Sequence, residues 1–113
     1  MKLRTGETTS VVIANGAALS SAIDMSGSSG LGIFMPAAWT AAEIAFQVSH
    51  DGTTYYPLHD SDDALVEETV TVDNAYSCSV DLFPFRYVKL WSESAGSDEN
   101  QGAARTIIVV VKS

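Results

Sequence analysis

The chain has few basic residues. Six lysines and arginines stand against fourteen aspartates and glutamates in 113 residues, which gives a formal net charge of −8 at pH 7. Binding of nucleic acid depends largely on lysine and arginine side chains that neutralise backbone phosphates. Because six cations cannot cover a face of so acidic a body, we expect no nucleic-acid partner.

Cysteine and long apolar runs are also scarce. The single cysteine, Cys78, cannot form an internal disulfide, and it alternates with polar Ser77 and Ser79 as a small core residue would. No apolar run approaches the length that spans a bilayer, and Met1–Arg4 leads into polar residues rather than into the apolar core of a signal peptide. We therefore expect a protein that is made in the cytoplasm and associates with no membrane.

The sequence holds no recognisable catalytic apparatus. His50 and His59 fall at the two far ends of a predicted hairpin, and no serine or cysteine lies in a nucleophile-elbow motif. A histidine in a turn is usually solvated surface. We expect no enzymatic activity, no catalytic residue and no cofactor.

One acidic stretch has the ligand chemistry of a cation site. Asp60–Asp63, with Glu67 and Glu68 downstream, offers the carboxylate oxygens that a hard cation such as Ca²⁺ selects. The spacing lacks the glycine at position 6 and the glutamate at position 12 of an EF-hand loop. Because acidic turns are mostly solvated charge, we expect no bound metal here.

Short strand-like runs alternate with turn residues from end to end, and no segment has a convincing helical period. One helical turn over Pro36–Ala42, with Thr40 as its N-cap, is an alternative to a loop there. Strands at this spacing indicate an all-β fold, and more finely an antiparallel two-sheet β-sandwich of the jelly-roll kind. The predicted strands are Thr8–Ala14, Ala17–Ile23, Gly32–Met35, Glu43–Ser49, Tyr55–His59, Leu65–Val72, Tyr76–Leu82, Tyr87–Glu93 and Thr106–Lys112.

The length fits one domain, which we expect over residues 10–113, after an N-terminal arm over residues 1–9. Two of the six basic residues, Lys2 and Arg4, lie in this polar arm. The arm either reaches across to an acidic neighbour or is an ordinary frayed terminus.

Alternation in two strands predicts the core. Ile44, Phe46 and Val48 alternate with small or polar neighbours, and Val88 and Leu90 alternate in a later strand. We expect these five side chains to lie in one core.

The last predicted strand is apolar on both faces through the run Ile107–Val111. An antiparallel strand with one face in water should alternate. Its outer side, which carries Ile108 and Val110, is therefore expected to be covered by a loop or buried against another subunit.

Aromatic side chains supply further apolar surface. Tyr87 and Trp91 lie opposite the predicted core residues of their strand, on a face that is a sugar-stacking platform, a protein interface or a set of rings packed under a long loop. The candidate glycan-stacking residues are Trp39, Tyr55 and Trp91, and the candidate interface residues are Lys2, Arg4, Trp39, Tyr87, Trp91, Ile108 and Val110.

The hairpin Phe46–Leu58, with Asp-Gly at its turn, resembles a hairpin of discoidin-like, or galactose-binding-like, β-sandwiches, and Arg86–Leu90 resembles a later strand of the same architecture. The resemblance implies a fold rather than a function, because this sandwich hosts sugar, lipid and protein binding as well as structural roles. Members that bind sugars use polar loops at one end of the sandwich. The matching loops here, Ser26–Gly30 and Ser94–Gln101, contain no arginine.

Four stretches taken in order resemble small structural proteins of tailed bacteriophages, among which capsid decoration (cement) proteins match best. They are Val11–Asp24, Met35–Ala42, the Asp51-Gly52 hairpin and Asn100–Arg105. The resemblance implies a non-enzymatic virion protein on the capsid exterior that binds the major capsid protein. It also implies a homo-oligomer, with a trimer favoured, because decoration proteins often occupy local threefold positions. The alternative is a carbohydrate-binding module, virion-borne or free, that stacks sugars on exposed aromatic rings.

Overall fold

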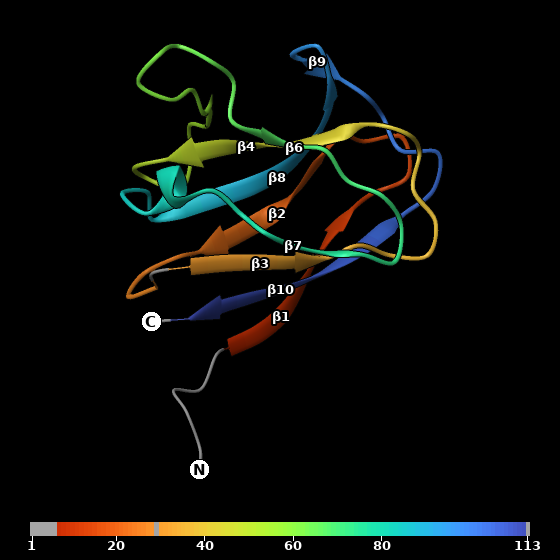
Figure 1. Cartoon of the computed structure of the whole chain (residues 1–113), viewed down its shortest axis with the longest axis horizontal. Coiled ribbons are helices and arrows are strands. Elements are labelled where there is room, and N and C mark those ends of the chain that lie inside the picture. Colours follow the sequence, from red (N-terminus) through yellow and green to blue (C-terminus); the bar gives the residue numbers. More distant parts are fainter. Residues whose placement is uncertain (1–6, 29, 113) are drawn as a thin grey trace.

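The computed structural model describes residues 7–28 and 30–112, and over these residues regular structure consists of strands and one short 3₁₀ turn, η1 (Val80–Leu82). All strand pairings are antiparallel (Figure 1). The strands are β1 (Glu7–Ile13), β2 (Leu19–Asp24), β3 (Gly30–Phe34), β4 (Glu43–Ser49), β5 (Tyr56–Pro57), β6 (Glu67–Glu68), β7 (Ala75–Ser77), β8 (Tyr87–Ser94), β9 (Ser97–Asp98) and β10 (Arg105–Lys112).

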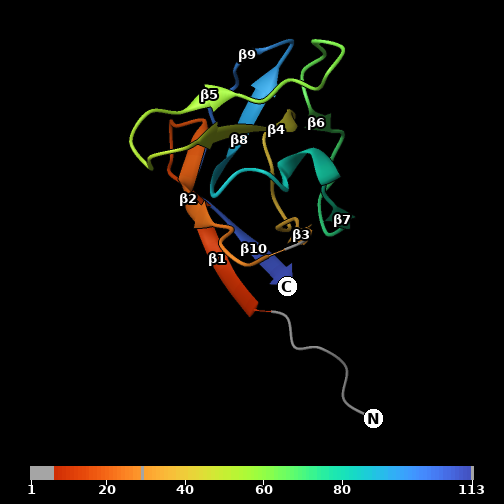
Figure 2. The ribbon, with the colours of Figure 1, turned by 90° about the vertical axis from the view of Figure 1, so that its left-hand side faces the viewer.

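The strands follow one hydrogen-bonded path, β5-β4-β8-β2-β1-β10-β3-β7, with β6 added to β4 and β9 added to β8. Strands β1 and β2 share a single pair, Ile13 with Ser20, and the sheet curls at this point (Figures 1 and 2). We call β2, β4, β5, β6, β8 and β9 the β8 half, and β1, β3, β7 and β10 the β10 half. The all-β antiparallel class is confirmed as a curled sheet, whereas the two-sheet jelly roll stays a prediction.

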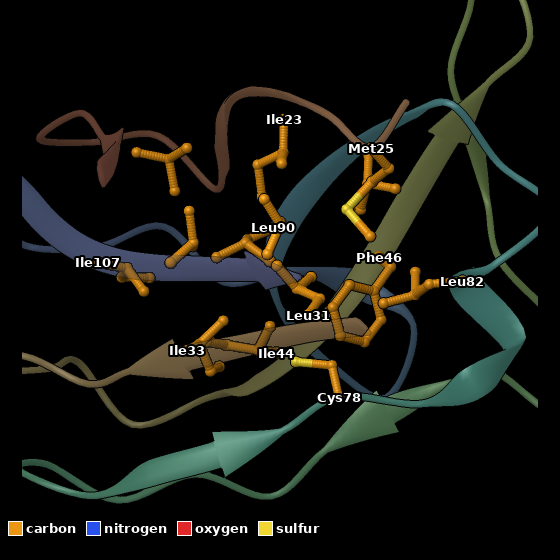
Figure 3. Packing of buried hydrophobic residues seen from close by; sticks show 14 of the residues in the cluster. Ile23, Met25, Leu31, Ile33, Ile44, Phe46, Cys78, Leu82, Leu90 and Ile107 are labelled. Atoms are coloured by element: carbon orange, nitrogen blue, oxygen red, sulfur yellow. The ribbon is translucent and has the colours of Figure 1, made fainter. Parts of the chain in front are cut away.

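One apolar cluster lies between the two halves (Figure 3). The five core residues predicted from alternation are all buried, which confirms the inward face of β4 and β8. The β10 half adds Ile33, Ile107 and Val109 to the same cluster. Cys78 is also buried there, as expected, and desolvation followed by the nearby Glu68 charge raises the pKa of its thiol to about 12.

Strand β10 lies between β1 and β3 rather than at an edge. Ile107, Val109 and Val111 are buried, Val110 is half-buried and Ile108 is exposed. The strand therefore alternates in burial although its sequence does not alternate in polarity. No loop of the described chain buries Ile108, so a second subunit as its cover stays a prediction.

Of the two alternatives for Pro36–Ala42, the structure shows the loop, in which the backbone of Thr40 is hydrogen-bonded to the Gln101 side chain. Three predicted strands were too long. Leu65–Val72 reduces to the two residues of β6, and Tyr55–His59 reduces to the two residues of β5. Tyr76–Leu82 begins in β7 but ends in the 3₁₀ turn η1.

Three residues that were predicted to belong to an N-terminal arm form part of a strand. Glu7, Thr8 and Thr9 pair with β10 and form the first half of β1, because their backbone groups find partners there. Lys2 and Arg4 lie outside the described residues.

Gln101, which is buried, ties three segments together. Its Oε1 accepts hydrogen bonds from the Thr40 N–H (2.8 Å) and Arg105 Nε (3.1 Å), and its Nε2 donates to the Thr40 carbonyl (3.0 Å) and to Ser92 Oγ (2.9 Å). A glutamine amide has two donors and two acceptor sites, so its capacity is fully used. Its backbone carbonyl accepts a further bond from the Gly16 N–H at 2.8 Å.

The Asp-Gly hairpin is confirmed by the pairing of Gln47 with Pro57 in β4 and β5. Gly52 takes a φ of 78°, a conformation that side chains disfavour. The Asp51 carboxylate accepts backbone hydrogen bonds from the residues two and three positions on, and these bonds, with one from Ser49, lower the pKa of Asp51 from 3.8 to about 2.

We expect Phe46→Ala to lower the free energy of unfolding by about 3 to 5 kcal/mol, because it leaves a cavity in the common core. The measurement is urea unfolding followed by tryptophan fluorescence. Phe34→Ala is the matched control, since Phe34 is 48% exposed, and it should cost below about 1 kcal/mol. Equal losses in the two variants would show that the inward face has been assigned incorrectly.

Asp51 predicts an acid-dependent loss of stability. Because its pKa is lower in the folded state, its contribution is fully present above the unfolded value of 3.8 and is lost as the pH falls toward about 2. Urea midpoints measured between pH 5 and pH 2 should fall more steeply for the wild type than for Asp51→Asn, which retains an acceptor oxygen but has no carboxylate to protonate. Parallel curves would contradict this role.

Candidate functional site

Ten residues on the outer side of the β10 half carry no ionisable side chain, and Lys112, which pairs with Gly30, adds a charge only at the end of this side. Residues directly opposite one another in neighbouring strands share a face, and the observed register links Ile108 with Ser10 and Phe34, and Val110 with Thr8 and Gly32. We call this surface the uncharged face. Its members are Thr8, Ser10, Val12, Gly32, Phe34, Ala75, Ser77, Thr106, Ile108 and Val110.

Three large apolar side chains of the uncharged face are open to solvent. Val12, Phe34 and Ile108 are 44%, 48% and 46% exposed. Phe34 and Ile108 are direct neighbours across β3 and β10, and Val12 lies on the adjoining strand β1. Contiguous apolar surface on a soluble protein usually marks an interaction site.

A shallow groove of about 390 Å³ runs along the β3 and β7 end of the uncharged face, and Lys112 beyond that face also lines it. Its floor is low at Gly32, which has no side chain and lies between Val110 and Ser77 in the register. Phe34 and Ala75 form its apolar wall. This part of the face therefore has both a hollow and an exposed ring.

Of the five candidate interface residues that the structure describes, Ile108 and Val110 lie on the uncharged face. Tyr87 lies on β8 in the other half and is half-buried, with the Arg86 guanidinium 4.9 Å from its ring centroid. Trp39 is half-buried against the main core, and its Nε1 donates to the Ala42 carbonyl at 3.2 Å.

Sequence reasoning missed Val12 and Phe34 as surface residues. Each adjoins a buried residue in an apolar pair, Val12 with Ile13 and Phe34 with Ile33. Strict alternation would have placed one member of each pair outside.

Trp91 is buried, so the expectation that it is an exposed interface or glycan-stacking residue was wrong. Trp91 is 4% exposed and packs with Ala18 and Ala45. Leu65, from the segment between β5 and β6, packs against this group. Its Nε1 donates to Asp98 Oδ1 at 2.7 Å, which satisfies the polar end of the ring. Of the three alternatives for this aromatic surface, a ring packed under a loop describes Trp91.

The other glycan-stacking candidates do not combine with Trp91 into one platform. Trp39 packs against the main cluster, whereas Trp91 belongs to a separate one. Tyr55 is half-buried, and the Lys89 ammonium lies 4.4 Å from its ring centroid. One face of the Tyr55 ring is therefore already in contact with a cation.

The acidic turn is held by its own hydrogen bonds, and the two histidines lie at the surface. Asp60 Oδ1 accepts hydrogen bonds from the Asp62 and Ala64 N–H groups at 2.8 and 3.0 Å, so this carboxylate stabilises its own turn. His50 and His59 are both exposed.

Among the described residues, three glutamates lie close together. Glu43, Glu67 and Glu93 each offer a carboxylate oxygen within 4.8 Å of those of the other two. Only Glu67 of these belongs to the acidic stretch of the sequence analysis. No helix within the described ranges is long and apolar enough to cross a membrane.

Comparison with known proteins gives one whole-length structural likeness. No protein-family model and no curated protein matches the chain. The crystal structure of the SPBc2 prophage-derived protein YomS is similar, with a TM-score of 0.58 and 13% sequence identity over 100% of this chain and 99% of that chain. At this identity the likeness shows a shared fold.

We expect Trp91→Ala to destabilise the fold by about 3 to 5 kcal/mol, because it empties the second cluster and leaves Asp98 without its indole donor. Thermal and urea unfolding measure the loss. Tyr56→Ala is the control, since this ring is 57% exposed and its removal should cost below about 1 kcal/mol. Loss of glycan binding by Trp91→Ala at unchanged stability would contradict the packing role.

Proposed function

We propose that this chain is a non-enzymatic bacteriophage virion protein that binds other protein subunits through the uncharged face. The observation that carries the proposal is the exposed group Val12, Phe34 and Ile108 on an uncharged sheet face of a protein with a net charge of −8. Uncharged apolar surface of this kind favours association, because its burial removes apolar area from water without desolvating a charge.

The bacteriophage context is supported by two observations of different kinds. The sequence resembles small structural proteins of tailed phages, and the fold is similar along its whole length to a prophage-derived protein. Within that context we propose a capsid decoration protein with a jelly-roll-like sandwich, located on the capsid exterior. Its partners are then the major capsid protein and further copies of the chain, with a trimer favoured.

At the β7 edge of the β10 half, face-on contact is favoured over strand addition. Edge strand β7 has only the three residues Ala75–Ser77, and short edges offer little backbone for pairing with another chain. The uncharged face, in contrast, presents side chains from the four neighbouring strands β1, β10, β3 and β7. A partner is therefore expected to cover side chains, with Phe34 and Ile108 at the centre.

We expect Ile108→Asp to weaken self-association and virion binding while the fold survives, because it places a charge in the contact without touching the core. Light scattering at micromolar concentration measures assembly, and circular dichroism measures folding. Val80→Asp is the control, since Val80 is 68% exposed but lies on η1, outside the uncharged face.

A wild type that is monomeric at all concentrations, and an Ile108→Asp variant that joins virions as well as the wild type, would together contradict the proposed interface. Mass spectrometry of purified virions, followed by cryo-EM localisation on head or tail, tests the virion role itself.

A further inference from the structure

Three glutamates from three strands meet on the outer side of the β8 half. Glu43 of β4 and Glu93 of β8 are direct cross-strand partners. Glu67 lies on β6, which pairs with β4 beside them. One carboxylate oxygen of each lies within 4.8 Å of those of the other two.

Glu93 is the unusual member, because it is a fully buried acid. Its side chain is 0% exposed. Oε2 accepts a hydrogen bond from the Gly96 N–H at 2.8 Å, and Oε1 is the one buried side-chain oxygen or nitrogen in residues 7–28 and 30–112 without a hydrogen-bond partner. A buried carboxylate oxygen without a partner is costly, and a positive ligand or a proton beside Oε1 would remove that cost.

The neighbouring negative charges also favour binding of a positive ligand or a proton. Like charges directly opposite one another across a sheet destabilise it, and Glu43 and Glu93 are such a pair. The site as built therefore favours neutralisation of its acids.

We infer that Glu43, Glu67 and Glu93 bind a divalent cation of the hard, oxygen-preferring class, with Ca²⁺ as the best match. Calcium takes carboxylate oxygens at about 2.3 to 2.6 Å, so two ligands on opposite sides of the ion are about 4.6 to 5.2 Å apart. Oxygens no more than 4.8 Å apart can thus share one ion with little movement. The ion would give Glu93 Oε1 its missing partner and replace repulsion by attraction.

The site has access to solvent. Glu67 is exposed and lines a cavity of about 380 Å³ together with Trp91 and Gly96. Calcium usually takes six to eight oxygen ligands, and water entering this cavity can supply those that the three acids do not. The indole of Trp91 is also placed to sensitise a lanthanide bound beside Glu67.

The test compares thermal unfolding of the full chain in EDTA and in millimolar CaCl₂. Calcium at ten times its Kd should stabilise the wild type by RT ln 11, about 1.4 kcal/mol, which corresponds to a rise in Tm of about 5 °C or more for a domain of this size. Direct binding is followed by Tb³⁺ luminescence excited through tryptophan and its displacement by Ca²⁺.

Glu67→Gln and Glu93→Gln should each remove the calcium-dependent rise in Tm and lower Tb³⁺ affinity by at least about tenfold. Glu68→Gln is the matched control, because it makes the same change one residue along β6, outside the three-acid group, and it should keep both signals. Exposed Glu67 keeps the test valid even if Glu93→Gln fails to fold.

An unchanged wild-type Tm together with no saturable Tb³⁺ signal would overturn the inference and leave a proton shared between Glu67 and Glu93. Equal calcium effects in Glu67→Gln and Glu68→Gln would overturn it too, because the cation would then bind elsewhere.

Discussion

The curled sheet depends on the apolar cluster between its halves, because the backbone joins these halves weakly. Ile13 and Ser20 form the single pair between β1 and β2. The pairing of β2 with β8 is itself irregular between Leu19 and Ala22, and there Ser20 Oγ accepts the Leu90 N–H at 2.9 Å in place of a backbone carbonyl. The halves are thus held face to face mainly by the burial of side chains that both contribute.

Because both halves turn their inner sides toward the common cluster, each has an outer side, and the two outer sides differ in what covers them. On the β8 half, Trp91 and Ala45 are buried beneath Leu65, and the carboxylates of Glu43, Glu67 and Glu93 gather beside them. On the β10 half no described segment performs this covering role, and the uncharged face is left open. The outer side of the β8 half thus has clustered negative charges, whereas the outer side of the β10 half has exposed apolar side chains. The two proposed ligands differ accordingly: a cation for the β8 half and a protein for the β10 half.

The alternation of apolar and polar residues predicted those features of the fold that depend on the sequence of a single strand. The boundaries of Glu43–Ser49 and the inward face of Phe46 follow from a period of two, which every half-buried strand shows. The candidate sites depend instead on which strands become neighbours. Burial of Trp91 requires Ala18 and Leu65, and the acid group requires the register of Glu43 with Glu93, so neither could be predicted from a local pattern. The run Ile107–Val111 is intermediate. Its apolar outer side was recognised, but Phe34, which pairs with Ile108, and Val12, which pairs with Thr106, come from strands distant in sequence.

The two proposed sites are separable, because they lie on opposite outer sides of the curled sheet and share no residue. Glu43 and Glu93 sit on the far side of β4 and β8 from Ile44 and Leu90, which enter the common core. A cation there acts on the pairing of β4, β6 and β8, and its effect reaches the uncharged face only through that packed core. Such coupling needs two alternative packings of the core, and a close-packed apolar interior resists small continuous shifts. Cation binding is therefore expected to govern the stability of the subunit, while the uncharged face governs its association.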